Sequence, residues 1–190
     1  KGLVLTNHHC GFDAVQDHST LDRNYIRDGF WAKTNAEELV NPKLFVTFIV
    51  RIEDVSKQVL SGVTAAMSES ERQSLVDRNS AELINTVKKE SFQSALIKPF
   101  YEGNQYYLFV TETYNDVRLV GTPPSSIGNF GKDTDNWMWP RHTGDFSVFR
   151  VYTKPDGSPA KRDEAVNGNL PMKPKWYLPV SLKPLKDGDF

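Results

Sequence analysis

The sequence has little of several features by which whole classes of protein are recognised. It holds one cysteine in 190 residues, which excludes an internal disulfide framework. No stretch approaches about 18 uninterrupted apolar residues, so the sequence predicts no membrane-spanning helix. The 23 Lys and Arg residues balance 24 Asp and Glu residues and form no basic stripe, so nucleic-acid binding lacks its electrostatic basis. Internal repeats and low-complexity runs are absent as well.

Aromatic residues, in contrast, are plentiful: the chain has four Trp, seven Tyr and eleven Phe. Such a chain has enough apolar surface to bury a core, as one domain or as one large piece of a longer protein. The chain begins at Lys1 without an initiator Met and stops at Phe190, directly after a turn signal at Gly188. We therefore expect a fragment.

The hydrophobic pattern predicts a mainly β fold with one helical insertion. Val55, Val59 and Val63 recur every fourth residue, and a capping box at Ser68 and Glu71 precedes a second helical run. The expected helical insertion covers about 54–98. Strands are expected directly after Gly2 and at 44–52, 106–111, 117–120, 146–152 and 176–182. Turn signals between these strands favour an antiparallel barrel or sandwich. Between them, 121–141 is a long irregular stretch of the kind that usually has a function.

Two adjacent histidines, His8 and His9, precede Cys10 at the end of the first expected strand. A histidine in that place is held rigidly while its ring reaches a cleft, so the pair holds a candidate base. The alternative is one buried and one exposed histidine without a chemical role. Zinc is a further alternative, because all three side chains are zinc ligands. Neighbouring strand residues point to opposite faces, however, which argues against one ion held by both rings.

Asp145 follows Gly144 at the start of the apolar strand 146–152. A carboxylate among such neighbours needs a hydrogen-bond partner. An imidazole N–H would supply one, and the two groups would form the base and orienting acid of nucleophilic catalysis. Alternatively, Asp145 caps a turn.

The segment 133–139 places two acids, an amide and two indoles within seven residues. Carboxylates and the Asn136 carbonyl accept protons from an amine, and the indole face of Trp137 supports a cation. The segment is therefore a candidate site for an amine-bearing ligand, or else a loop anchored by tryptophan packing.

The sequence resembles the bacterial serine dipeptidyl-peptidases typified by dipeptidyl-peptidases 7 and 11. The resemblance rests on the runs GLVLTNHHCG, DVRLVG, PPSSIG and DTDNWMWPRHTGDF, which begin at positions 2, 116, 123 and 133. That family has a chymotrypsin-type double barrel. The resemblance implies that 1–190 is one N-terminal catalytic β-barrel fragment, with the second barrel and a helical domain lying beyond this chain.

By position, the resemblance implies that His9 is the general base and Asp145 its orienting acid. Asn136 and Trp137 match the positions that hold the free amino terminus of the substrate. Cys10 matches one half of a disulfide whose partner lies upstream of this chain. At position 132 the resemblance leads us to expect glycine, whereas this sequence has lysine.

The nucleophile of such an enzyme sits in a Gly-x-Ser-Gly turn. Ser61, Ser125, Ser126 and Ser158 all lack that setting, so no catalytic serine is assigned to this chain. The implied activity is removal of dipeptides from free peptide N-termini, without cofactor or metal. The serine would come from the rest of the polypeptide, in a periplasmic or secreted homodimer. The alternatives are a non-catalytic peptide-binding module on the same fold and a metallohydrolase. A preference for acidic or apolar side chains before the scissile bond does not follow from these residues.

Overall fold

The computed structural model describes residues 1–132, 134, 138–139, 142–161 and 166–189. The strands are β1 (Leu3–Thr6), β2 (Phe30–Trp31), β3 (Leu39–Val40), β4 (Val46–Asp54), β5 (Gln93–Phe100), β6 (Gln105–Tyr114), β7 (Asp116–Thr122), β8 (Ser147–Thr153) and β9 (Leu170–Pro171). The helices are α1 (His8–His18), α2 (Tyr25–Asp28), α3 (Ser56–Val59), α4 (Glu69–Thr86) and α5 (Ser125–Gly128), with 3-10 turns η1 (Asn35–Glu37) and η2 (Tyr101–Gly103).

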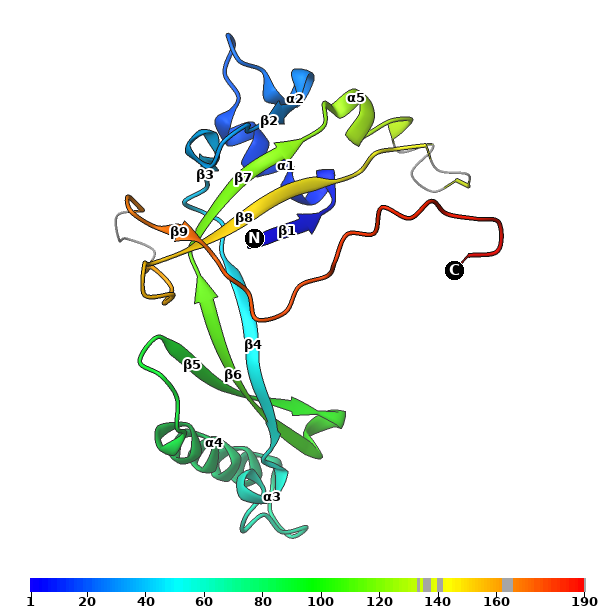
Figure 1. Cartoon of the computed structure of the whole chain (residues 1–190). Helices are drawn as coiled ribbons and strands as arrows, with labels where there is room; N and C mark the ends of the chain where they lie inside the picture. Colours follow the sequence, from blue (N-terminus) through cyan, green and yellow to red (C-terminus); the bar gives the residue numbers. More distant parts are fainter. Residues whose placement is uncertain (133, 135–137, 140–141, 162–165, 190) are drawn as a thin grey trace.

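The strands form two antiparallel sheets, which lie at opposite ends of the view in Figure 1. The larger sheet has the order β1-β8-β7-β2, with β3 also paired to β7 and β9 to β8. The smaller has the order β4-β6-β5. The expected mainly β, antiparallel fold with helices is confirmed. Within the described residues, however, the sheets stay open and do not close into a barrel. No helix there is long and apolar enough to cross a bilayer.

Helices α3 and α4 cover one face of the smaller sheet. The buried core between them consists of Val55, Val59, Val76, Tyr106, Leu108 and Val110. Helix α4 begins at the predicted capping box: the Glu71 N–H donates to the Ser68 hydroxyl, and the Ser68 N–H donates to the Glu71 carboxylate. This part of the helical prediction is confirmed.

The end of the expected helical insertion is wrong, because β5 begins at Gln93, before position 98. Ala95 and Ile97 pack against the helical layer and pair with Val110 and Leu108 of β6. Their spacing of two residues is that of a strand, and the pairing with β6 fixes it.

Helix α1 packs on the larger sheet and immediately follows β1 (Figure 1). Ala14 and Val15 of α1 are buried against Val117, Leu119 and Phe149 of β7 and β8. The histidine pair therefore begins a helix, and the prediction that it ends a strand is corrected.

Glycine at position 11 lets α1 lie close to β8. A Cβ at Gly11 would lie 2.7 Å from the Ser147 hydroxyl and 3.0 Å from the Ser147 Cβ. The missing side chain thus allows the start of the helix to approach the start of β8, which lies two residues beyond Asp145.

The strands expected at 44–52, 106–111, 117–120 and 146–152 are confirmed as β4, β6, β7 and β8. The first strand forms, but the expectation that it is buried is wrong. It lies at an edge of the larger sheet, and its Leu5 is 74% exposed. The strand expected at 176–182 is also wrong: this segment pairs with no strand among the residues that the structure describes, and Trp176 is 89% exposed. β-forming residues make a strand only where a neighbouring strand accepts their backbone hydrogen bonds.

Candidate active site

The first turn of α1 and the residue before Phe146 meet at one end of the larger sheet. In the antiparallel pairing of β1 with β8, Thr6 lies opposite Ser147. The residues that follow Thr6 therefore lie beside the residues that precede Ser147. His9 Nδ1 lies 2.7 Å from Asp145 Oδ2. The His9 backbone N–H donates to the other carboxylate oxygen, Oδ1, at 3.1 Å. Asp145 is thus held by both the ring and the backbone of His9.

The carboxylate of Asp145 is charged in this setting. Its side chain is 19% exposed, and this burial alone would raise its pKa. The hydrogen bonds from the His9 backbone and ring, together with the charge of His9, outweigh the burial and hold the pKa of Asp145 below its ordinary value. An ionised carboxylate at Nδ1 favours the tautomer with its proton on that nitrogen, which leaves Nε2 as an acceptor.

The His9 ring projects into solvent, since its side chain is 69% exposed. Its Nε2 has no hydrogen-bond partner among the described residues. A proton acceptor is therefore presented on the open side of a fixed imidazole–carboxylate pair, which is the arrangement that a general base requires.

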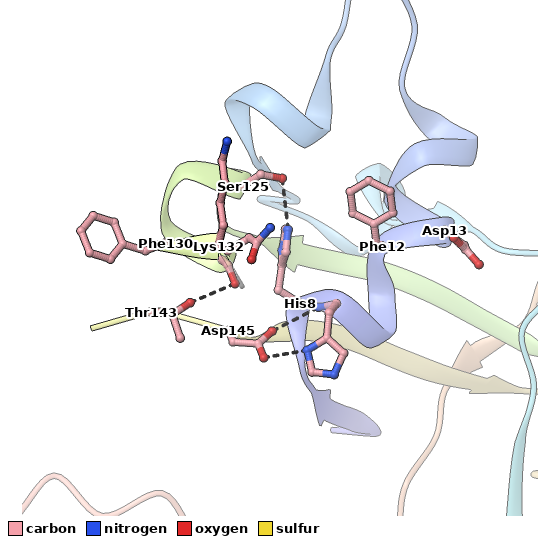
Figure 2. A pocket seen from close by; sticks show the side chains of 11 residues that line it. His8, Phe12, Asp13, Ser125, Phe130, Lys132, Thr143 and Asp145 are labelled. Atoms are coloured by element: carbon pink, nitrogen blue, oxygen red, sulfur yellow. Dashed lines mark hydrogen bonds and ion pairs between the residues drawn. The ribbon is translucent and has the colours of Figure 1, made fainter. Parts of the chain in front are cut away.

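His8 turns the opposite way and is 2% exposed. Its Nδ1 lies 2.9 Å from the Thr122 hydroxyl. Its Nε2 lies 3.3 Å from the Ser125 hydroxyl, a contact that Figure 2 shows. Burial lowers the pKa of His8, and the charge of Asp145 only partly opposes this effect. His8 therefore stays neutral in the fold and joins α1 to the start of α5.

The pairing of Ser125 with His8 does not make a second catalytic pair. A serine beside a histidine is the usual geometry of a nucleophile and its base. The far nitrogen of His8, however, contacts the hydroxyl of Thr122 and no carboxylate of the described part of the chain. Ser125 also follows two prolines and begins a short helix, so it lacks the glycine turn of an oxyanion hole.

A cavity of about 440 Å³ lies beside the His9–Asp145 pair. Figure 2 shows Phe12 from α1 around it, together with Phe130, Lys132 and Thr143, which lie between α5 and β8 in the sequence. Lys132 has a φ of 50°, in the left-handed region that favours glycine. Glycine is the residue that the family resemblance leads us to expect there, so the backbone of position 132 has a glycine-like shape although its side chain is lysine.

Asn136 and Trp137 lie outside the described residues, so their role at a substrate amine stays a prediction. The catalytic roles of His9 and Asp145 also stay predictions, although the structure brings the two side chains together. The zinc alternative gains no support, since the described residues hold no group of three or more His, Cys, Asp or Glu that could bind a metal ion. His8 and His9 face different partners, and Cys10 is exposed.

One contact was missed by sequence reasoning. The Asn7 amide donates to Asp145 Oδ2 at 3.2 Å. The only sequence signal for it is the position of Asn7 directly before the histidine pair, where an asparagine is typical of a helix start.

An imidazole held by an ionised carboxylate beside an open cavity is an arrangement that hydrolases use for a general base. The Peptidase S46 family model matches residues 1–190, and the chain belongs to this peptidase family. The resemblance to bacterial dipeptidyl-peptidases is thereby confirmed.

Two relatives from Capnocytophaga gingivalis show how far the likeness extends. The chain is 58% identical over 190 residues to an Asp/Glu-specific dipeptidyl-peptidase, covering 100% of this chain and 26% of the relative. It is 49% identical to a dipeptidyl-peptidase 7, again covering 100% of this chain and 26% of the relative. The chain thus spans about a quarter of the length of these relatives.

Solved structures agree with this placement. A crystal structure of Porphyromonas endodontalis DPP11 in an alternate conformation superposes with a TM-score of 0.84 at 45% identity. The superposition covers 99% of this chain and 28% of that structure. The same enzyme in complex with substrate superposes with a TM-score of 0.79 at 44% identity, covering 99% of this chain and 28% of that structure.

Proposed function

We propose that this chain is the N-terminal part of a serine dipeptidyl-peptidase and supplies the general base and the orienting acid of its triad. The observation that carries the proposal is the 2.7 Å contact between His9 Nδ1 and Asp145 Oδ2, found in a chain of the S46 family. The serine would come from the part of the parent polypeptide outside this chain.

In the parent enzyme, His9 Nε2 takes the proton of the serine hydroxyl as the serine oxygen attacks the second peptide carbonyl. The C–N bond then breaks, and His9 returns the proton to the leaving amine. Water attacks the remaining ester with the same assistance and releases the dipeptide. General base catalysis of this kind contributes roughly 10²–10⁴-fold. Asp145 keeps the Nδ1 proton in place and stabilises the imidazolium.

Dipeptide removal requires that the enzyme recognise the free amino terminus. We assign that role to Asn136 and Trp137, in keeping with the family pattern and with the acceptor and indole chemistry of 133–139. The proposal includes an acidic residue before the scissile bond. Relatives at 58% and 54% identity are named Asp/Glu-specific, and related DPP11 structures hold the dipeptides Arg-Glu and Arg-Asp.

The two open sheets would belong to the first barrel of a chymotrypsin-type double barrel, completed by chain outside 1–190. The match to DPP11 over 99% of this chain supports this placement. Location in the periplasm or outside the cell and pairing into a homodimer complete the proposal. Cell fractionation and light scattering of the parent protein test these two points.

The test uses the full-length parent protein and fluorogenic dipeptides ending in Asp or Leu, each with a free or an acetylated amino terminus. We expect turnover of free Asp substrates and little turnover of acetylated ones, because an acetylated amine can no longer donate fully to the acceptors of the proposed amine site. His9→Ala should reduce kcat by at least about a hundredfold. His18→Ala, on the same helix but bonded to Asn41, should leave kcat unchanged.

A fluorophosphonate probe should label the parent protein and leave the 190-residue chain unlabelled. A parent protein that binds peptides and resists the probe would instead be a non-catalytic binding module. Equal turnover of free and acetylated substrates would contradict the amine-site assignment.

A further inference from the structure

Asn7 occupies the N-cap position of α1 but does not cap the helix. An asparagine at this position normally accepts a hydrogen bond from a backbone N–H of the first turn. The Asn7 side chain makes no such bond, although its φ of −71° and ψ of 154° are those of an N-cap. Its amide nitrogen instead donates to Asp145 Oδ2 at 3.2 Å and to the Asp145 backbone carbonyl at 3.4 Å.

The carboxylate of Asp145 takes over the capping role. Its Oδ1 accepts the backbone N–H of His9, the second residue of α1, at 3.1 Å. Its Oδ2 accepts both the His9 ring and the Asn7 amide, and one carboxylate oxygen has lone pairs for two donors. Each oxygen therefore has a fixed partner.

We propose that Asn7 is a positioning residue of the triad, which fixes the Asp145 carboxylate so that Oδ2 faces the His9 ring. This inference rests on the proposed peptidase function. The terminal torsion of an aspartate is broad, so a carboxylate without fixed donors rotates readily. The Asn7 amide donates hydrogen bonds to both the side chain and the backbone carbonyl of Asp145, and thereby restricts this rotation.

The substitution Asn7→Asp separates positioning from capping. Aspartate is as good an N-cap as asparagine, so a role in capping alone predicts an unchanged enzyme. If Asn7 positions Asp145, the substitution replaces a donor by a second carboxylate directly beside Oδ2. Like charges at this distance repel, and two carboxylates beside one imidazole favour its protonated form. The base would then be lost at higher pH than in the parent.

The experiment measures kcat, KM and their pH dependence for the full-length parent, Asn7→Asp and Asn7→Ala. The matched control is Asn24→Asp, because Asn24 caps α2 in the ordinary way and accepts the Arg27 N–H at 2.9 Å. We expect kcat to fall about ten- to a hundredfold in both Asn7 variants, which is the range for loss of a hydrogen bond to a charged group. KM should be unchanged. The acid limb of kcat should move to higher pH in Asn7→Asp alone, and Asn24→Asp should match the parent.

A second readout does not depend on turnover. The low-field proton NMR signal of the His9 N–H bonded to Asp145 should shift or broaden in Asn7→Asp and persist in Asn24→Asp. If a folded Asn7→Asp enzyme keeps the kcat of the parent and the acid limb of its pH profile, the positioning role of Asn7 is overturned and the proposed peptidase function is not. A parent protein without dipeptidase activity would overturn the proposed function, and an unmoved NMR signal in Asn7→Asp would then overturn the role of Asn7 as well.

Discussion

Replacing Asp145 by asparagine isolates the contribution of one negative charge to the site. The side chain keeps its size, but its amide has one acceptor for the three donors that now reach the carboxylate. These donors are the His9 ring at 2.7 Å, the His9 backbone N–H at 3.1 Å and the Asn7 amide at 3.2 Å. If the asparagine NH₂ faces Nδ1, the ring must place its proton on Nε2, and the base is then blocked.

The size of the effect follows from the charge pair that forms during reaction. Two unit charges about 4 Å apart interact by about 4 kcal/mol at an effective dielectric constant of about 20. The His9 ring is 69% exposed in this chain, so solvent screening lowers this figure. A loss of about 2–3 kcal/mol in transition-state stabilisation corresponds to a fall in kcat of roughly thirty- to two-hundredfold.

The assay is steady-state hydrolysis of a free-amine dipeptide substrate by the full-length parent and by its Asp145→Asn variant. Circular dichroism and thermal unfolding verify that the variant is folded. The matched control is Asp156→Asn, because the exposed Asp156 also accepts a backbone N–H and a hydroxyl, both from Ser158, away from the site. A folded Asp145→Asn enzyme with kcat within about threefold of the parent would refute the role of the charge.

Two further predictions concern buried His8. Gly128→Ala should lower the free energy of unfolding by about 1–3 kcal/mol, because the new Cβ would lie 2.4 Å from His8 Cγ. The buried His8 ring cannot move away without losing its hydrogen bond to Thr122. An unchanged midpoint of urea unfolding would contradict this prediction. Burial lowers the pKa of His8 in the fold, so the unfolded chain binds a proton more readily and stability is lost as pH falls below the ordinary histidine value of 6.5. Thermal unfolding followed through that pH range should show a steeper fall for the parent than for His8→Gln, and parallel curves would refute the assignment.

Structural elements that depend on residues close together in the chain could be predicted from the sequence. The capping box at Ser68 and Glu71 depends on residues three apart, and it is present as expected. The strands β6 and β8 are dense in aromatic and β-branched residues, which favour a strand over a helix. An imidazole partner for Asp145 was expected because a carboxylate among apolar residues needs a donor, and the choice of His9 came from the family resemblance.

Features set by a distant partner could not be predicted. The segment after Cys10 contains Gly11, which is normally a turn signal, and the helix there is stabilised by contacts with β8. Conversely, Trp176 and its neighbours have the composition of a strand, but nothing in the described residues pairs with them. Closure of a barrel is likewise a property of strand neighbours and not of any single segment.

The position of Asn7 shows how the site and the helix depend on each other. β1 pairs with β8, and the absent side chain at Gly11 lets the first turn of α1 settle against Ser147. In this position the backbone N–H of His9, in the first turn of α1, faces Asp145, which lies two residues before the start of β8. The Asp145 carboxylate accepts the hydrogen bond from this N–H. The same carboxylate then has its second oxygen directed at the imidazole, while Asn7, released from capping, holds it there. The Asp145 side chain thus has two roles: its negative charge caps the start of α1, and it is also the acidic partner of the His9 imidazole. It follows that substitutions at Asp145 should lower both helix stability and catalysis, whereas Asn7→Asp keeps a residue that can cap α1 and should act mainly on catalysis.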